Sequence, residues 1–392
     1  MQPLWKPLVS AWDLVACPPP GYRFVVRQGR VESAARWASR FTAAYHFIYL
    51  TRPLLPINLL KAYLNGRGKV PQGTDLVYAM QCLWFGKGPW ILEMQSEGPH
   101  TLVGSRELFL RHRERVRSVL RSPACRGIIY GLEAGKRTLL QLLGGDEVIE
   151  GKVRVIPWAV PPKPRTLRRP DGKLRLLFVA SANVHDLSNF DLKGGKEVVE
   201  AFCHLRSRYP HVELVVRCPL TPAWRRRLQE MEGVHVYEHT LPGEEFDQLW
   251  RTADIFAQPT QITPSTAYLD ALSYGLPVVT TDVWGNGELI EDGRTGFLVP
   301  KPRARRYTQG CVMMYHSPEH RRDWHTLDEE VVQGLVLRLS LLIENPGLRS
   351  RMGGAARQEI TGGKHSFAQR NPVLKDLLDQ ALEHGSDGDG GA

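Results

Sequence analysis

Residues 270–299 read DALSYGLPVVTTDVWGNGELIEDGRTGFLV, a stretch that combines a buried strand with a glycine-rich loop. The run 276–281 is short, apolar and partly β-branched, which predicts a strand covered on both faces, as in a parallel sheet. The glycines that follow it indicate a tight loop and a short helix, and Gly296 indicates a turn into a last strand. Strand, loop, helix and strand in this order are typical of a doubly wound α/β domain.

The same alternation of apolar runs and amphipathic helices extends upstream to residue 174. The expected strands are 174–180, 212–218, 234–239 and 253–259, and the expected helices are 195–209, 222–231, 243–252 and 265–274. Strand and helix in alternation imply crossover connections between parallel strands. This half of the chain therefore predicts a complete doubly wound domain.

The first half of the chain follows a similar plan. Short apolar runs at 22–26, 75–80, 89–94, 127–132 and 153–160 predict strands, and 31–50 and 105–120 predict helices. A chain of 392 residues is long enough for two domains, each with its own core. Proline and arginine without periodicity predict a linker at 163–173, after a first domain of residues 1–162. The predicted fold class is therefore α/β, with two doubly wound Rossmann-like domains.

The composition argues against several classes of protein. Hydrophobic residues make up 42% and charged residues 23% of the chain, and no run approaches the ~18 apolar residues of a membrane span. The N-terminus lacks the continuous apolar segment of a secretory signal. The six cysteines form no CxxC pair, which argues against a zinc site or a disulfide framework and predicts a cytoplasmic location.

The net charge of +10 is concentrated in arginine clusters. They lie at 111–121, 165–169, 225–227 and 303–306. None is interleaved with aromatic residues, so they are interpreted as solvated helix faces and loops, and no nucleic-acid partner is predicted.

The arginine-rich helix at 106–121 has two interpretations. Its apolar residues are Leu108, Phe109, Val116 and Leu120. Arginine beside such residues is the composition of an interfacial helix, which would give peripheral contact with an anionic membrane at its inner face. The alternative is an amphipathic helix that packs on its own sheet and leaves a wet basic face.

In an open parallel sheet, ligands bind at the carboxyl ends of the strands, so the loops after the expected strands hold the candidate site. Lys193 precedes two glycines and a helix, where an ammonium can lie beside a phosphate, although such a lysine is often only solvated. Ser265 and Thr266 occupy the start of a helix, where they either cap it or leave backbone N–H groups for an anion. Asp270 can accept from two ribose hydroxyls or serve as a surface charge. Glu288 opens the short helix of the glycine loop.

The runs KGGKEVVEAF (193–202), ADIFAQPT (253–260) and YLDALSYGLPVVTTDVWGNGELIEDGRTGFLV (268–299) together resemble the C-terminal domain of the GT-B glycosyltransferases of retaining family 4, also called glycosyltransferase group 1. The resemblance implies two Rossmann-like domains that face a cleft. It implies an acceptor-binding domain at 1–162, a donor-binding domain at 174–365 and a helix at 366–383 that returns to the first domain. Residues 384–392 predict a disordered tail.

The resemblance also implies roles for particular residues. Lys193 would neutralise the diphosphate of a UDP-, GDP- or ADP-sugar donor, and Asp270 would hold the ribose. Backbone amides near Ser265 and Thr266 would bind the distal phosphate, and Glu288 falls on the glutamate of the family's glycine-rich loop. No cofactor or metal is expected, because Lys193 and helix N-termini can stabilise the leaving diphosphate and no loop holds a convincing DxD-like pair. In the retaining branch the leaving phosphate itself accepts the proton of the acceptor hydroxyl, so the resemblance implies no need for a protein base.

Two positions depart from the family pattern. Ile262 stands where the family has the first of two glutamates separated by seven residues, and Ser188 stands where it has a phosphate-binding arginine. Asn183, His185, Arg217 and Thr263 are the polar residues that can replace the lost contacts.

Three functions remain open at this point. The first is transfer of a sugar from a nucleotide-sugar to an acceptor hydroxyl, with the retention of configuration that the resemblance implies. Should a protein base be used, the candidates are Glu93, Glu97 and His100 after an expected strand of the first domain. The second is a catalytically impaired GT-B protein that acts as a binding or scaffold subunit, and the third is an inverting GT-B enzyme.

Overall fold

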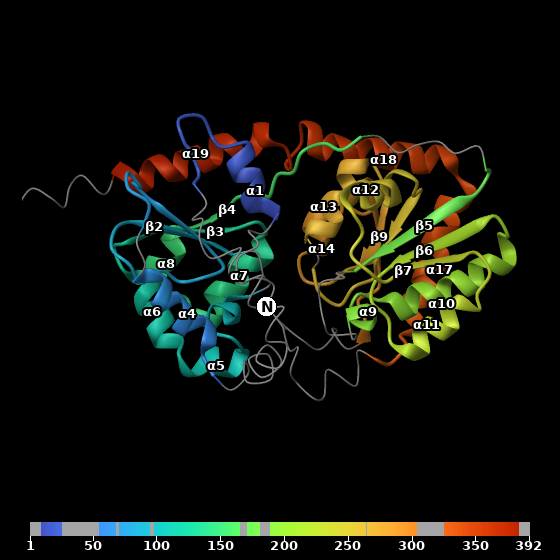
Figure 1. Ribbon diagram of the computed structural model, residues 1–392, viewed down its shortest axis with the longest axis horizontal. Coiled ribbons are helices and arrows are strands. Elements are labelled where there is room, and N and C mark those ends of the chain that lie inside the picture. Colours follow the sequence, from blue (N-terminus) through green and yellow to red (C-terminus); the bar gives the residue numbers. More distant parts are fainter. Residues whose placement is uncertain are drawn as a thin grey trace, which may run out of the picture. The chain divides into compact units, whose positions relative to one another are not determined.

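The computed structural model shows an α/β chain that divides into two compact units (Figure 1). The described residues are 9–25, 55–67, 70–94, 98–164, 171–180, 189–263, 265–303 and 325–383. Unit 1 contains the described residues up to Ala159 together with those from Phe367 onward, and unit 2 contains those from Val160 to Ser366. The two divisions lie close to the expected boundaries at 162 and 365.

Unit 1 is built on a parallel sheet of four strands in the order β1-β2-β3-β4. The strands are β1 (Val77–Met80), β2 (Trp90–Met94), β3 (Cys125–Tyr130) and β4 (Val153–Val155). Its helices are α1 (Val9–Ala16), α4 (Ile57–Gly66), the 3-10 helix η1 (Pro99–Leu102), α5 (Arg106–Arg111), α6 (Arg113–Arg121), α7 (Glu133–Leu143), α8 (Glu147–Lys152) and α19 (Phe367–Glu383).

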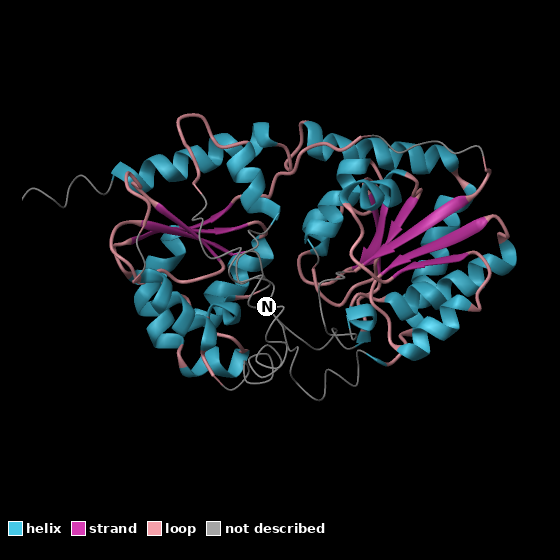
Figure 2. Cartoon of the chain, in the orientation of Figure 1, coloured by secondary structure: helices cyan, strands magenta, loops and turns pink. Residues whose placement is uncertain are grey.

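Helices lie on both faces of this sheet (Figure 2), and each face carries its own apolar cluster. Ile91 and Ile129 point to α1 and α19, where they pack with Leu14 and Leu377. Their neighbours on the strands point to the opposite face and pack with α4 to α8. Because side chains alternate along a strand, both faces of a covered sheet are apolar, which is the pattern that predicted these strands.

Two expectations for unit 1 are corrected. Residues 22–25 of the expected strand 22–26 form no strand: the chain turns at Gly21 (φ 85°), and the hydroxyl of Tyr22 donates to Asp379 on α19 at 2.5 Å. The expected helix 105–120 is two helices, α5 and α6, that meet at His112. The expected helix 31–50 lies outside the described residues.

The burial of α5 and α6 settles how their apolar residues are used. The side chains of Leu108, Phe109, Val116 and Leu120 are between 0% and 3% exposed and belong to the core of unit 1. Side chains already packed on the sheet cannot enter a lipid bilayer. The interpretation of 106–121 as an interfacial helix is therefore wrong for its apolar face, and the packed amphipathic helix is correct.

Unit 2 contains a parallel sheet of six strands in the order β7-β6-β5-β8-β9-β10. The strands are β5 (Leu174–Val179), β6 (Val212–Arg217), β7 (Val234–Tyr237), β8 (Ile255–Ala257), β9 (Val278–Thr281) and β10 (Gly296–Val299). The chain builds outward from β5 to β7 and then returns to add β8 on the other side of β5. This strand order is that of a dinucleotide-binding α/β fold, and its direction reverses between β5 and β8.

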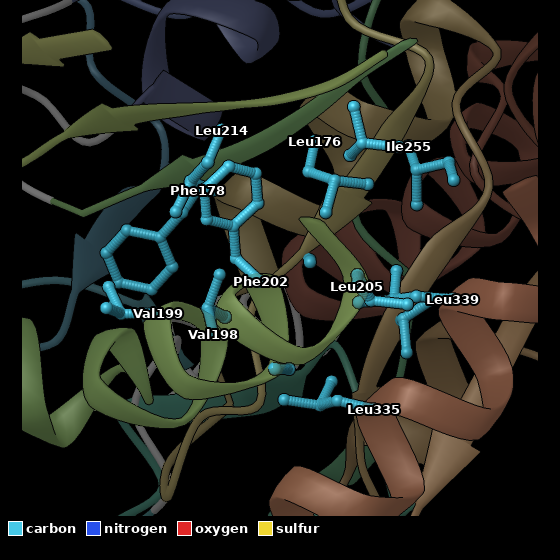
Figure 3. Close-up of a cluster of buried hydrophobic side chains, with 14 of the residues drawn as sticks. Leu176, Phe178, Val198, Val199, Phe202, Leu205, Leu214, Ile255, Leu335 and Leu339 are labelled. Carbon is cyan, nitrogen blue, oxygen red and sulfur yellow. The ribbon is translucent and has the colours of Figure 1, made fainter. Parts of the chain in front are cut away.

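Helices cover both faces of the second sheet. They are α9 (Asn189–Leu192), α10 (Gly195–Arg208), α11 (Pro222–Gln229), α12 (Gly243–Arg251), α13 (Ser265–Tyr274), α14 (Asn286–Leu289), α17 (Glu329–Glu344) and α18 (Pro346–Thr361). On one face, Phe202 of α10 and Leu339 of α17 pack with Leu176 and Leu214 of the strands (Figure 3). On the other face, the ring of Trp250 stacks on that of Tyr274 with centroids 5.8 Å apart, which joins α12 to α13.

Side-chain caps fix where several of these helices begin. The hydroxyl of Thr221 accepts from the backbone N–H of Trp224, and Pro222 follows as the first helical residue of α11. Asp328 accepts at the start of α17, and Asn345 accepts at the start of α18. Each cap satisfies a backbone N–H that has no partner inside its helix, and such capping residues indicate in the sequence where a helix begins.

Within the described part of the chain, no single helix has the length and apolar character needed to cross a membrane. The pair α17 and α18 passes by length and composition together, but the two helices are bent by 102°.

The contact between α10, α17 and the sheet gives a stability prediction. Leu339→Ala removes a side chain that is 0% exposed and should lower the free energy of unfolding of unit 2 by about 2–5 kcal/mol, through lost burial and the cavity that remains. Leu337 lies on the same helix and is 60% exposed, so Leu337→Ala should change it by no more than about 0.5 kcal/mol. Urea unfolding followed by circular dichroism measures both, and equal effects would contradict the assigned face of α17.

Candidate functional site

The candidate site lies at the carboxyl ends of β5, β8 and β9, where the order of strands reverses. Hydrogen bonds join the loops that leave these strands. The backbone N–H of Gln261, after β8, donates to the carbonyl of Leu192 at 3.0 Å. The hydroxyl of Thr281, at the end of β9, donates to the carbonyl of Thr260, and the amide of Gln258 donates to Val179 at the end of β5. A crevice edge of this kind is where open α/β sheets bind their ligands.

Lys193 stands on the turn between α9 and α10. Gly194 has φ 81°, and a Cβ on it would lie 2.3 Å from the carbonyl oxygen of Pro259. Only glycine accepts both the left-handed backbone and this close approach. The KGG sequence is therefore explained by packing of the Lys193 turn directly on the loop after β8, the loop that carries Ile262 and Thr263.

The second lysine of KGGK has a different environment. Lys196 is 2% exposed, and its ammonium lies 2.8 Å from the carboxylate of Glu197, which is 3% exposed. Burial raises the pKa of Glu197, and the charge of Lys196 opposes that shift. Lys193 is half-buried. Of the two lysines, Lys193 is thus the one with access to a ligand.

Arg217 ends β6 at the same edge of the sheet. Its side chain is buried: one terminal nitrogen donates to the carbonyl of Ala180 at 3.0 Å, and the guanidinium lies 5.1 Å from the centre of the Phe246 ring. Burial lowers its pKa, and no carboxylate of the described residues lies within ion-pair distance of it. A buried arginine without an acidic partner is costly unless an anion binds there.

The thiol of Cys218 shows which charges gather at this edge. Its pKa is raised to about 12, chiefly by burial. The positive charges of Arg217 and Lys193 act against that shift, and the negative charges of Asp191 and Glu238 add to it. Both cations thus lie close enough to Cys218 to influence its pKa.

Among the residues that the structure describes, several buried polar atoms along this edge have no hydrogen-bond partner. They are Nε of Arg217, Oδ1 of Asp191, Oε1 of Gln258, Oε1 of Gln261 and Oδ1 of Asn286. Buried polar atoms in folded proteins are almost always paired, with protein, water or ligand. Their concentration at the carboxyl edge indicates a polar site built for a ligand with many donors and acceptors.

The other predicted residues of unit 2 lie around α13 and α14. Ser265 is the first residue of α13, Thr266 is exposed, and Asp270 is half-buried one turn later. Burial and Asp247 raise the pKa of Tyr274, and the charge of Asp270 adds to this shift, so Asp270 lies on the side of α13 that carries Tyr274.

The remaining donor-site candidates divide into described and undescribed residues. Thr263 is half-buried in the loop before α13, and Glu288 is half-buried on α14, where its backbone carbonyl accepts from Lys364. Asn183, His185 and Ser188 lie outside the described residues. The roles assigned to this set stay predictions.

In unit 1, Glu93 is held by neighbours rather than presented to solvent. It is 3% exposed, and its two carboxylate oxygens accept from the hydroxyl of Tyr78 at 2.9 Å and from the indole N–H of Trp158 at 3.2 Å. Arg370 of α19 lies close by: burial lowers its pKa, and the charge of Glu93 opposes this. Glu93 and Arg370 line a small cavity together with Tyr78 and Trp158.

His100 lies in η1 and is 5% exposed. Its backbone carbonyl accepts from the N–H groups of Val103 and Gly104. Glu97 lies outside the described residues. The geometry of Glu93 and His100 favours structural roles, and their assignment as catalytic groups remains a prediction.

Sequence reasoning missed Gln258, Gln261, Asn286 and Asp191. A signal existed for the first two: a glutamine that directly follows the buried strand IFA, or closes the loop after it, has to find polar partners. For Asn286, the glycines on either side already account for the turn of the loop, so the sequence gives no separate signal. The partner of Asp191 is His325, whose Nδ1 lies 2.5 Å from its Oδ2, a pairing across 134 positions that no local pattern reveals.

Comparison with known proteins assigns unit 2. Residues 174–317 match the family model described as glycosyl transferases group 1. The D-inositol 3-phosphate glycosyltransferase of Arthrobacter sp. (strain FB24) is 31% identical over 163 residues, which are 39% of this chain and 37% of that protein. The sulfoquinovosyl transferase of Arabidopsis thaliana is 37% identical over 67 residues, 16% of this chain and 13% of that protein. The matches thus span well under half of these curated relatives.

Solved structures show the fold of the whole chain. The Anabaena protein HepE, solved with UDP and glucose, is similar with a TM-score of 0.58 at 13% identity, over 95% of this chain and 96% of that one. The sucrose-phosphate synthase of Thermosynechococcus elongatus gives 0.57 at 16% identity, over 85% and 79%. The expected GT-B architecture of two Rossmann-like units is confirmed. Residues 174–317 of the second unit are similar to the glycosyl transferases group 1 family.

Proposed function

We propose that the protein transfers a sugar from a nucleotide-sugar donor to an acceptor hydroxyl. The observation that carries the proposal is the buried guanidinium of Arg217, which has no acidic partner among the described residues and lies at the carboxyl edge of the sheet with Lys193. Two cations at the reversal of strand order suit a diphosphate. The similarity of residues 174–317 to the glycosyl transferases group 1 family supports the same donor class.

The reaction needs stabilisation of charge more than a protein base. The bond between the anomeric carbon and the diphosphate oxygen breaks, and the bond from that carbon to the acceptor oxygen forms. Lys193 and Arg217 face the negative charge that develops on the diphosphate, in a site where burial strengthens their effect. The acceptor proton passes to a phosphate oxygen of the leaving group, and the configuration at the anomeric carbon is retained without a metal ion.

Arg217 would also replace the phosphate-binding arginine that the family has at the position of Ser188. The family's arginine precedes the lysine in the loop after β5, whereas here the second cation comes from the neighbouring strand β6. Stacking on Phe246 and the bond to Ala180 hold its guanidinium in place before a ligand arrives. A preorganised cation aimed at a fixed position is what such a site requires.

The donor sugar would meet an altered loop. Ile262 has no side-chain acceptor for a sugar hydroxyl, and Thr263 beside it is half-buried. The unpaired Oε1 of Gln261, next to Ile262, supplies an acceptor in the same loop. We propose that this loop holds the sugar through Gln261 and Thr263. The acceptor would be bound by unit 1. The five cysteines within the described ranges are free thiols, and this supports a cytoplasmic location.

Substitution of Arg217 tests the donor site. Arg217→Ala should weaken binding of the preferred nucleoside diphosphate by about tenfold to a hundredfold, because hydrogen bonds to a charged group are lost. Isothermal titration with UDP, GDP and ADP measures the change. Arg226→Ala is the matched control, since Arg226 is exposed on α11 and should leave binding unchanged. Unaltered affinity in the Arg217 variant would remove the proposed role of this residue.

Turnover separates the enzyme from the binding or scaffold subunit. Incubation with UDP-, GDP- or ADP-sugars should release free nucleoside diphosphate, slowly with water and faster with an acceptor, and Lys193→Ala should abolish the release. Tight donor binding without any turnover, over a panel of sugar and lipid acceptors, would instead favour the scaffold. The anomeric configuration of the product, read by NMR, distinguishes retention from inversion.

Glu93 provides a test of structural against catalytic use. Glu93→Gln removes the charge beside Arg370 and one acceptor of a buried pair, so it should lower the free energy of unfolding of unit 1 by about 1–3 kcal/mol. Glu150→Gln on α8 changes an exposed carboxylate and should have no such effect. Denaturant unfolding gives both values. A Glu93→Gln protein of normal stability that has lost its turnover would make Glu93 the catalytic base instead.

A further inference from the structure

Helix α4 of unit 1 has an apolar surface that the described residues leave open. Leu60, Tyr63 and Leu64 are 58%, 38% and 52% exposed. They stand at helical spacing on one face, while Leu59 and Ala62 point inward to the core. We call Leu60, Tyr63 and Leu64 the α4 surface. Apolar side chains grouped on the outer face of a helix, in addition to those on its inner face, indicate a surface that binds a partner.

Arginines lie directly beside the α4 surface. Arg67 donates to the hydroxyl of Tyr63 at 2.6 Å, and its guanidinium lies 4.4 Å from the centre of that ring. The ring of Tyr63 packs edge-on against Phe85 at 6.0 Å, and Arg115 of α6 lies 5.8 Å from the centre of Phe85. Arg67 thus lies against Tyr63 of the α4 surface, and Arg115 lies against the neighbouring ring of Phe85.

Helices α5 and α6 extend this positive charge. Figure 1 shows both beside α4 on the same side of unit 1. Their apolar side chains are buried, so what they present to solvent is mainly arginine, against Glu107 and Glu114. Glu114 is already paired with Arg117 at 3.0 Å. The charge around α4 is therefore positive, which complements an anionic partner.

We propose that the α4 surface docks unit 1 on an anionic lipid bilayer. Leu60, Tyr63 and Leu64 enter the boundary between headgroups and acyl chains, and Arg67 and Arg115 bind lipid phosphates at the rim. Apolar side chains flanked by cations are the combination that holds a helix in a membrane interface, and a tyrosine with its hydroxyl on an arginine belongs at the headgroup level. Nucleic acid would use the arginines but leave the leucines in water. This docking goes beyond sugar transfer and does not depend on it.

The test is flotation of the full-length protein with vesicles of phosphatidylcholine, with or without phosphatidylglycerol. The wild type should float with the anionic vesicles at low salt, float less at high salt, and stay behind with the neutral ones. The variant Leu60→Glu/Leu64→Glu should lose at least about tenfold in partitioning, because two leucines that would enter the bilayer are replaced by charges that anionic lipid repels. If the wild type does not float with anionic vesicles, the proposal is overturned.

A matched control exists in unit 2. Leu337 and Leu341 of α17 are 60% and 40% exposed at the same spacing, so Leu337→Glu/Leu341→Glu makes the same change elsewhere and should float like the wild type. Equal loss in both double variants would mean that the α4 surface is not the site. Arg67→Glu provides a second measurement that leaves the leucines intact, and it should reduce binding to anionic vesicles.

The other occupants of α4 give distinct results. A protein partner in the form of a second copy of this chain would appear as a dimer in size-exclusion chromatography that Leu60→Glu/Leu64→Glu converts to monomer, without any flotation. Cover by residues 26–54 would appear as a lower unfolding midpoint of that variant, again without flotation. Either pattern overturns the bilayer as the partner.

Discussion

The contact between Gly194 and Pro259 is the constraint on which the candidate site depends. It brings the turn that follows α9 onto the loop that follows β8, across the point where the order of strands reverses. Any side chain at 194 would separate the two, and the hydrogen bond from Gln261 to Leu192 would be lost with them. Because the turn and the loop are locked together, Lys193 and the residues around Ile262 form one surface.

This surface has an unusual balance of charge. The cations Lys193 and Arg217 are accompanied by buried acceptors and a buried carboxylate, Asp191, that binds His325 from a distant part of the chain. Such an arrangement is costly in the absence of a ligand, since buried polar atoms stay unpaired. The fold tolerates it because the apolar clusters on both faces of the six-stranded sheet supply the stability elsewhere. Ile262 in the loop after β8 and a cation, Arg217, at the end of β6 are therefore compatible with the proposed donor site.

The two units contribute different kinds of chemistry. In unit 2, polar groups gather at a strand edge and remain available. In unit 1, the buried carboxylate of Glu93 accepts hydrogen bonds from Tyr78 and Trp158. The apolar outer face of α4 is exposed. A division of this kind suits a protein whose second unit binds a small charged ligand while its first unit meets a larger partner.

The sequence by itself determined the strands, their order of appearance and the family resemblance of the second half, because buried parallel strands appear as continuous apolar runs and glycines mark the loops between them. It also placed Lys193 and the short helix of the glycine loop, since both follow local patterns. Only the tertiary structure decided that Arg217 is buried with no acidic partner among the described residues and that Asp191 pairs with His325. It also decided that Leu108 and Phe109 face the core while Leu60 and Leu64 do not. Helical periodicity gives the faces of a helix but not which face meets the sheet, and contacts between distant segments leave no mark on local sequence.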